Sequence, residues 1–136
     1  MVNKDTKLFI SVASSPTNFG ATVYNTLFKK YNIDAIYLPK KATTASDLIQ
    51  SIKTLSISGC SVSMPLKSDI VKYLDNYDDV VKNTNMSNTI INDNGKLIGY
   101  NTDVIGITNC IKNLNLSSVL IYGGGAICRS AVYSLK

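Results

Sequence analysis

Two residues of opposite charge in this sequence have side chains suited to moving a proton to or from a bound substrate. Lys67 follows a short apolar segment, and Asp103 begins a stretch with helical periodicity. A lysine amine and an aspartate carboxylate placed near each other could form a pair that takes up and releases a proton. Burial favours the neutral amine and an aspartate favours the ammonium, so the sequence leaves open which prevails and whether water relays the proton. Taken singly, Lys67 is expected to be a surface lysine and Asp103 a helix N-cap.

The chain contains no histidine, and this narrows the chemistry available to it. Imidazole bases, Ser-His triads and histidine-ligated metal sites are excluded, so proton transfer falls to lysine, acidic side chains, tyrosine or cysteine. Cys60, Cys110 and Cys128 are odd in number and 50 and 18 residues apart. This spacing fits neither a disulfide framework nor a metal knuckle, so we expect small buried hydrophobic residues and no metal site.

A glycine-rich turn near the end of the chain could hold a phosphate. Residues 118–122 are apolar and lead directly into Gly123, Gly124 and Gly125, after which a helix is expected from Ala126. A strand, a glycine turn and a helix begin dinucleotide-binding units, in which backbone N–H groups hold the pyrophosphate. Cys128 replaces the third glycine of that fingerprint, so a merely tight turn is the alternative interpretation. The lysine and hydroxyl residue that end a Walker loop are missing.

The remaining pattern predicts an α/β fold with a mixed sheet. Apolar runs predict strands at residues 7–13, 33–38 (stopped by Pro39), 60–63, 88–92, 96–100 and 118–122. Helical spacing or flanking residues predict helices at about 21–31, 45–55, 65–74, 78–82, 103–114 and 126–136. The Asn-Gly pair between 92 and 96 is a strong hairpin signal, and it makes one strand pair antiparallel. Polar side chains after several strands then fall at the edge where open α/β sheets bind ligands.

The composition is that of a soluble globular protein. The chain has 136 residues, 45% of them hydrophobic and 17% charged, which predicts one domain with at most a fragment of a second. Its longest apolar runs fall well short of the roughly 20 residues of a membrane span, and the N-terminus shows no signal peptide. We therefore expect no membrane partner and a cytoplasmic location.

The net charge of +5 comes mainly from lysines spread along the chain, and Arg129 is the only arginine. Proteins that recognise nucleic acids usually use arginine side chains and clusters of basic residues. We therefore expect these lysines to form a solvated surface that does not bind nucleic acid. An anionic small-molecule ligand is the alternative use of this charge.

Four segments, in order, resemble the shikimate dehydrogenase family. They span residues 62–67, 87–90, 99–103 and 123–129. Residues 3–6, 17–20 and 59–65 look more like its shikimate dehydrogenase-like branch. The resemblance implies a three-layer substrate-binding domain at residues 1–102, a connecting helix at 103–116, and the start of an NADP-binding Rossmann domain at 117–136.

The activity that the resemblance implies is the NADP-dependent interconversion of shikimate and 3-dehydroshikimate, in aromatic amino acid (chorismate pathway) biosynthesis. Lys67 and Asp103 match the family's catalytic pair, and together with Ser63 and Asn88 they match its substrate contacts. The phosphate turn corresponds to Gly123, Gly124, Gly125 and Ala126.

The sequence departs from the family at the loop that holds the substrate carboxylate. Asn18 and Gly20 stand where the biosynthetic enzyme has serines. The Asn18 amide, the Gly20 N–H, or the hydroxyls of Ser14 and Ser15 could donate instead, so quinate or another cyclic hydroxy acid is an alternative substrate.

Full family members are considerably longer than this chain. We therefore expect a fragment that binds NADP(H) weakly or not at all and does not turn over alone. The alternatives are a non-catalytic binding module for a small anionic polyol and an inactive truncated product. Apolar residues at 119–122 and along the last helix would favour self-association.

Overall fold

The computed structural model describes residues 2–136 and is organised around one six-stranded sheet. Its strands lie in the order β2-β1-β3-β5-β6-β4. β1 is parallel to β2 and β3, β5 is antiparallel to β3 and β6, and β4 is parallel to β6. The predicted mixed α/β sheet is confirmed, with strands β1 (Lys7–Ala13), β2 (Ala35–Lys41), β3 (Gly59–Val62), β4 (Asn76–Tyr77), β5 (Thr89–Asp93) and β6 (Lys96–Tyr100).

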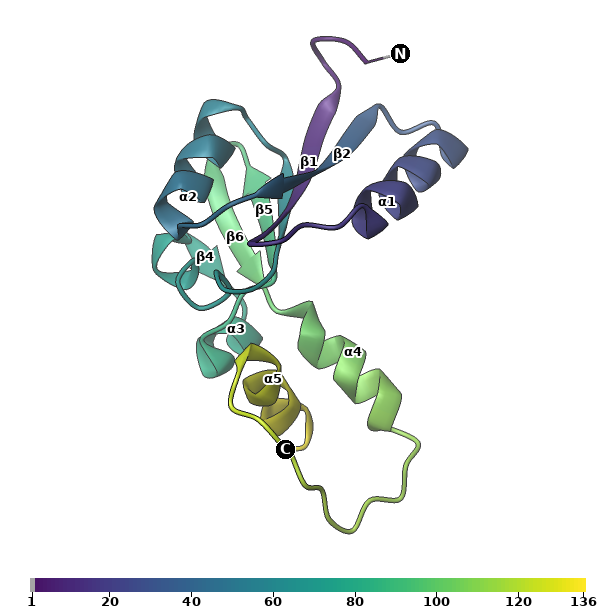
Figure 1. The fold of residues 1–136 in the computed structure, drawn as a ribbon, viewed down its shortest axis with the longest axis vertical. Helices are drawn as coiled ribbons and strands as arrows, with labels where there is room; N and C mark the ends of the chain where they lie inside the picture. The colour runs from purple at the N-terminus through teal and green to yellow at the C-terminus, as the bar shows by residue number, and fades with distance from the viewer. Residues whose placement is uncertain (1) are drawn as a thin grey trace.

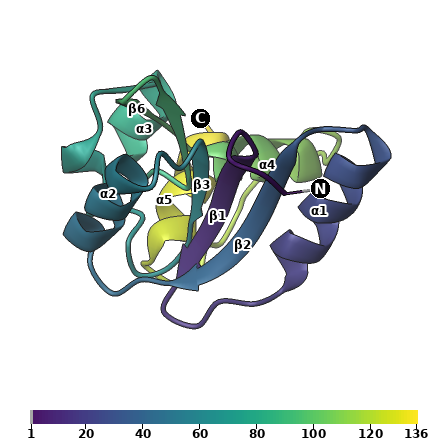
Figure 2. The ribbon, with the colours of Figure 1, turned by 90° about the horizontal axis from the view of Figure 1, so that it is seen from above.

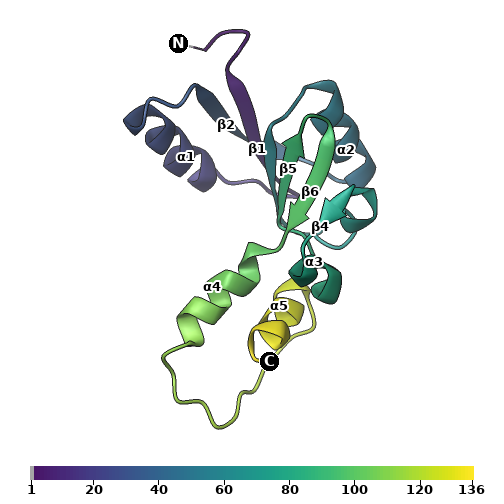
Figure 3. The same ribbon diagram turned by 180° about the vertical axis from the view of Figure 1, so that it is seen from behind.

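Helices cover the sheet on both faces and extend beyond it. α1 (Phe19–Lys30) lies on one side and α2 (Ala45–Thr54) on the other, so the sheet forms the middle of three layers (Figures 1 and 2). α3 (Asp79–Thr84) packs near the end of the sheet. α4 (Thr102–Ile111) and α5 (Ala126–Ser134) pack against each other and project away from the strands, as Figure 3 shows.

The two faces of the sheet differ in character. Ile10 and Val12 of β1 and Cys60 and Val62 of β3 are buried in one apolar cluster with Leu48, Ile49 and Ile52 of α2. Because side chains alternate along a strand, Ser11 and Ser61 point to the opposite face, toward α1. The main apolar core therefore lies on the α2 side, whereas the α1 side holds the two serines together with a group of aromatic rings that includes Phe9 and Phe28.

The hairpin forms where the Asn-Gly signal placed it. β5 and β6 pair from Thr89 and Tyr100 to Asp93 and Lys96. Asn94 and Gly95 have φ angles of 51° and 92°, as the turn between closely paired antiparallel strands requires. This hairpin brings the end of β6, and with it the start of α4, to the edge of the sheet where β3 ends, with β5 between the two strands.

The predicted helix over residues 65–74 is wrong. This segment forms a series of turns followed by a short 3-10 helix, η1 (Val71–Tyr73). The Lys67 carbonyl accepts a hydrogen bond from the Ser87 N–H at 2.9 Å instead of from the next helical turn. A tertiary contact thus replaces the hydrogen bond that would have continued a helix.

The predicted end of the second strand at Pro39 is also wrong. β2 continues through Pro39 to Lys41, and Pro39 stands opposite Ser11. β2 is an edge strand, so one of its sides has no neighbouring strand. Proline is tolerated there because no hydrogen bond from its position is needed on that open side.

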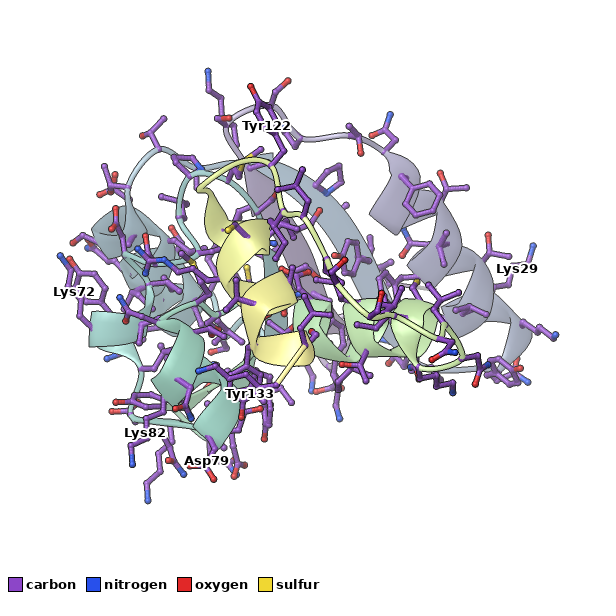
Figure 4. The ribbon with its side chains drawn as sticks, turned by 90° about the horizontal axis from the view of Figure 1, so that it is seen from below. Lys29, Lys72, Asp79, Lys82, Tyr122 and Tyr133 are labelled. Atoms are coloured by element: carbon purple, nitrogen blue, oxygen red, sulfur yellow. The ribbon has the colours of Figure 1, made fainter. Side chains whose placement is uncertain are left out.

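The predicted strand at residues 118–122 does not form. Leu120 and Tyr122 are 95% and 103% exposed, and Figure 4 shows Tyr122 extending from the outline of the molecule. No strand among residues 2–136 lies beside this segment, so its backbone has no ladder partner. The α5 helix that follows it forms as predicted.

The cysteines do not share one environment. Cys60 is buried, as expected, whereas Cys110 is exposed and Cys128 is half-buried, which corrects the expectation for these two. The lysines other than Lys67 are exposed, and Figure 4 shows Lys29, Lys72 and Lys82 pointing outward from three different elements. Lys67 is largely buried, which corrects the expectation of a surface lysine. None of the helices within residues 2–136 is long and apolar enough to span a membrane.

Candidate active site

Lys67 and Asp103 form an ion pair at one end of the sheet. The Lys67 Nζ donates to the Asp103 Oδ2 at 2.6 Å, and their side chains are 12% and 20% exposed. Lys67 lies in the turns after β3, and Asp103 lies in the first turn of α4, directly after β6. The fold therefore brings together the two residues that could handle a proton.

Asn88 fixes the second carboxylate oxygen of this pair. Its Nδ2 donates to the Asp103 Oδ1 at 2.9 Å and to the Thr102 Oγ1, and its Oδ1 accepts from the Thr102 N–H at 3.0 Å. Each oxygen of Asp103 thus has its own donor, which leaves the carboxylate one orientation. The lysine is held by a rigid acceptor.

A cavity of about 350 Å³ lies beside the ion pair, at the carboxyl ends of β1 and β3. Ligands bind at this edge in open α/β sheets. Of the residues expected to bind substrate, Gly20, Ser63, Lys67 and Asn88 line it. Hydroxyl groups dominate the rest of the wall, from Ser11, Ser15, Thr17, Tyr24, Ser61, Thr89 and Thr102. The cavity suits a small ligand with several oxygens.

Asn18 and Gly20 differ in their relation to this cavity. Asn18 precedes α1 as its N-cap residue, is exposed and does not line the cavity. Gly20 lies in the first turn of α1 and does line it. A Cβ atom on Gly20 would lie 3.1 Å from the Tyr37 ring, so the absence of a side chain lets that ring approach. The structure brings position 20, and not the Asn18 side chain, to the cavity wall.

Three cavity residues without an assigned role in the sequence analysis lie in a row across the sheet. Ser11 of β1 stands opposite Ser61 of β3, which stands opposite Thr89 of β5. The row depends on the register of strands that are distant along the chain. The strand pattern would have revealed it only with that register known.

Asn101 is a further residue that the sequence did not single out by itself. It is 2% exposed, and its Nδ2 donates to the Thr84 Oγ1 at 3.1 Å and the Ser130 Oγ at 3.0 Å. Its Oδ1 accepts from the Asp103 N–H at 3.2 Å and so caps α4. One side chain therefore joins α3 and α5 to the backbone of Asp103. An asparagine directly before a helix was the available signal.

The glycine turn lies apart from the cavity, before α5. Gly123 has a φ of +121°, and a Cβ on Gly123, Gly124 or Gly125 would meet nothing within 4 Å. Gly125 is the N-cap residue of α5 and has no side chain that could accept a hydrogen bond from the helix. The first turn of α5 contains no acidic residue. Uncapped helix N–H groups with open space before them are the donors that a phosphate prefers. Gly123, Gly124, Gly125 and Ala126 thus fit the phosphate portion of a dinucleotide.

Comparison with known proteins identifies the family to which this chain is related. A family model described as the shikimate dehydrogenase substrate binding domain matches residues 11–90, which is more than half of the chain. The chain belongs to the shikimate dehydrogenase family. The match covers the cavity walls contributed by β1, α1, β3 and β5, together with Lys67 and Asn88.

Relatives of this shikimate dehydrogenase family member match all or nearly all of its length. The shikimate dehydrogenase-like protein of Haemophilus influenzae is 38% identical, with 100% of this chain and 51% of the relative covered. The shikimate dehydrogenase (NADP(+)) of Pyrococcus furiosus is 33% identical, with 100% and 52% covered. The solved structure of shikimate 5-dehydrogenase from Listeria monocytogenes in complex with shikimate and NAD is 27% identical, with a TM-score of 0.81 and 98% and 49% covered. The chain thus spans about half the length of the curated relatives it matches.

Proposed function

We propose that the protein carrying this chain is an NADP-dependent oxidoreductase that interconverts shikimate and 3-dehydroshikimate. The observation that carries the proposal is the ion pair of Lys67 and Asp103 beside a cavity lined by hydroxyl groups. The relatives named for this reaction, and the structure that contains shikimate, support it.

The chemistry we propose for Lys67 follows from its position. In the reducing direction, the Lys67 ammonium donates a proton to the carbonyl oxygen of the substrate as that carbon becomes a secondary alcohol. In the oxidising direction the neutral amine takes up the hydroxyl proton. A bound nicotinamide cofactor supplies or accepts the hydride at the same carbon. Asp103 holds the Lys67 Nζ at the cavity wall, and Asn88 holds Asp103.

We propose that three segments of the chain have the separate functions that the resemblance implied. Residues 1–102 bind the substrate, with Ser63, Lys67 and Asn88 at the cavity wall. Residues 103–116 connect this part to the phosphate turn within residues 117–136. There Gly123, Gly124, Gly125 and Ala126 would hold the cofactor's phosphate through backbone N–H groups, and this assignment is supported by their open, uncapped geometry.

The experiment that tests the function follows absorbance of the reduced nicotinamide. The complete gene product is incubated with NADP or NAD and a panel containing shikimate, quinate and other cyclic polyols. We expect reduction of NADP with shikimate, and loss of this reduction in Lys67→Ala but not in Lys82→Ala, an exposed lysine of α3. Saturable shikimate binding without any reduction of NADP or NAD would instead identify a non-catalytic binding module.

A further inference from the structure

We propose that Ser11 and Ser61 form a carboxylate-binding subsite on the floor of the cavity, in place of the serines that the biosynthetic enzyme has where this chain has Asn18 and Gly20. The proposal rests on the proposed function, because it names the group of a cyclic hydroxy acid that this part of the cavity recognises. It assigns to two neighbouring strands a task that the sequence suggested for the loop before α1.

The two serines lie side by side at the right place. Ser11 and Ser61 are directly opposite each other in the parallel pairing of β1 and β3, and both line the cavity. Neighbouring strands lie about 4.8 Å apart, so two hydroxyls in register can reach the two oxygens of one carboxylate. Thr89 continues the row on β5.

Within the row of Ser11, Ser61 and Thr89, the hydrogen bonds show which hydroxyl protons are free. The Thr89 Oγ1 already donates to the Asn88 Oδ1 at 2.9 Å. The Ser61 Oγ accepts from the Tyr37 hydroxyl at 3.0 Å, so its own proton remains available. The Ser11 hydroxyl makes no hydrogen bond within the part of the chain that the structure describes. A ligand oxygen above Ser11 and Ser61 would therefore meet two free donors.

Tyr37 orients Ser61, and several contacts hold Tyr37 in place. Its ring is 5% exposed, stacks on Tyr24 with centroids 4.6 Å apart, and occupies the space that a side chain at position 20 would need. The Asn25 side chain accepts from the Tyr37 N–H at 2.8 Å and donates to its carbonyl at 2.9 Å. The missing side chain of Gly20 thus lets Tyr37 approach Ser61, which links the departure at position 20 to the subsite.

The charges around the cavity allow a carboxylate to bind at Ser11 and Ser61. Lys67 is the one ionisable cation among the lining residues described, and its ammonium is bound to Asp103. No acidic side chain is among the described residues that line the cavity, and the nearby Asp103 carboxylate is bound by Lys67 and Asn88. Hydroxyl donors hold a carboxylate through charge-assisted hydrogen bonds, which are about twice as strong as those to a neutral acceptor.

The experiment measures binding of shikimate and its methyl ester to the complete gene product by NMR titration. We expect Ser11→Ala and Ser61→Ala each to weaken shikimate binding about tenfold, as loss of a hydrogen bond to a charged group does, with a smaller effect on the ester. Ser61→Thr retains the hydroxyl and should bind as the wild type does. Tyr37→Phe should give a loss of about threefold, because Ser61 keeps its proton but loses its orientation.

Two further variants and the wild-type protein supply the comparisons that this experiment needs. Ser58→Ala should leave shikimate binding unchanged, because Ser58 directly precedes β3, at the end of that strand away from the cavity. Amide spectra establish that each variant is folded. Unchanged shikimate binding in Ser11→Ala and Ser61→Ala, equal losses for acid and ester, or a loss only in Ser15→Ala would overturn the subsite while leaving the proposed function intact. Absence of shikimate binding to the wild-type complete gene product would contradict both.

Discussion

The Lys67 ammonium lies 2.6 Å from the Asp103 carboxylate, although 36 residues separate the two along the chain. Lys67 follows β3, Asp103 follows β6, and β5 lies between these strands in the sheet. The antiparallel hairpin of β5 and β6 returns the chain to the edge at which β3 ends. The ion pair is therefore a product of sheet topology, and its chemistry can be tested separately from the fold.

Replacing Lys67 by alanine should abolish most turnover without unfolding the protein. If Lys67 transfers the substrate proton, its removal should lower kcat by about 10²- to 10⁴-fold, the usual contribution of a positioned acid or base. Steady-state kinetics of the complete gene product measures this, and the thermal midpoint reports folding. Near-normal turnover in Lys67→Ala would contradict the role proposed for its amine.

Replacing Asn101 by alanine should destabilise the chain. The change leaves the buried Thr84 and Ser130 hydroxyls without this donor and removes the cap of α4, which together should cost about 2–4 kcal/mol. Urea denaturation measures the free energy of unfolding. Asn83→Ala, which removes an exposed bond within α3, is the matched control and should cost about 0.5 kcal/mol or less. Equal effects in the two variants would show that the buried contacts of Asn101 contribute nothing.

Replacing Gly123 by valine should weaken NADP binding. Its φ of +121° is one that a β-branched residue does not adopt without strain, and the added side chain would stand where a phosphate approaches. We expect a raised KM for NADP with an unchanged KM for shikimate. Gly106→Ala in α4, where a Cβ atom would meet nothing within 4 Å, is the control outside the turn and should leave both KM values unchanged. An unchanged KM for NADP in Gly123→Val would argue against the phosphate assignment.

Cys60 should resist alkylation in the folded chain while Cys110 reacts. Burial raises the pKa of the Cys60 thiol from 9.0 to about 12, and the thiolate is the reactive form. Mass spectrometry after iodoacetamide treatment at pH 8 should find Cys110 modified at once and Cys60 modified only in denaturant. Rapid modification of Cys60 without denaturant would show that β3 opens readily.

The same thiol makes stability depend on pH. The unfolded thiol loses its proton near pH 9, whereas the folded thiol keeps it to about pH 12, so the unfolded state binds fewer protons between these values. The contribution of the buried neutral thiol is complete below pH 9 and declines as the pH rises toward 12. Urea denaturation from pH 8 to 11 should show a steeper decline for the wild type than for Cys60→Val, in which other titrations are unchanged.

Elements with local signals were predictable from the sequence. β1 and the Asn-Gly hairpin lie where their patterns placed them, because alternation and turn residues act within a few positions. The family resemblance identified Lys67 and Asp103 as a pair, which spacing alone could not do.

Features that depend on distant contacts were not predictable. The bond from Ser87 to the Lys67 carbonyl prevents a helix that local spacing favours, and residues 118–122 have β propensity but no neighbouring strand. The Ser11 and Ser61 row likewise requires a register that only the assembled sheet defines.

The alternation along β1 and β3 has an evolutionary consequence. Ile10, Val12 and Cys60 are sealed against α2, whereas Ser11 and Ser61, their immediate neighbours in the chain, face the open side. Mutations at the serine positions can alter ligand preference without loosening the interior. If these serines bind the ligand as proposed, its recognition could evolve at these two positions with the apolar residues beside them unchanged.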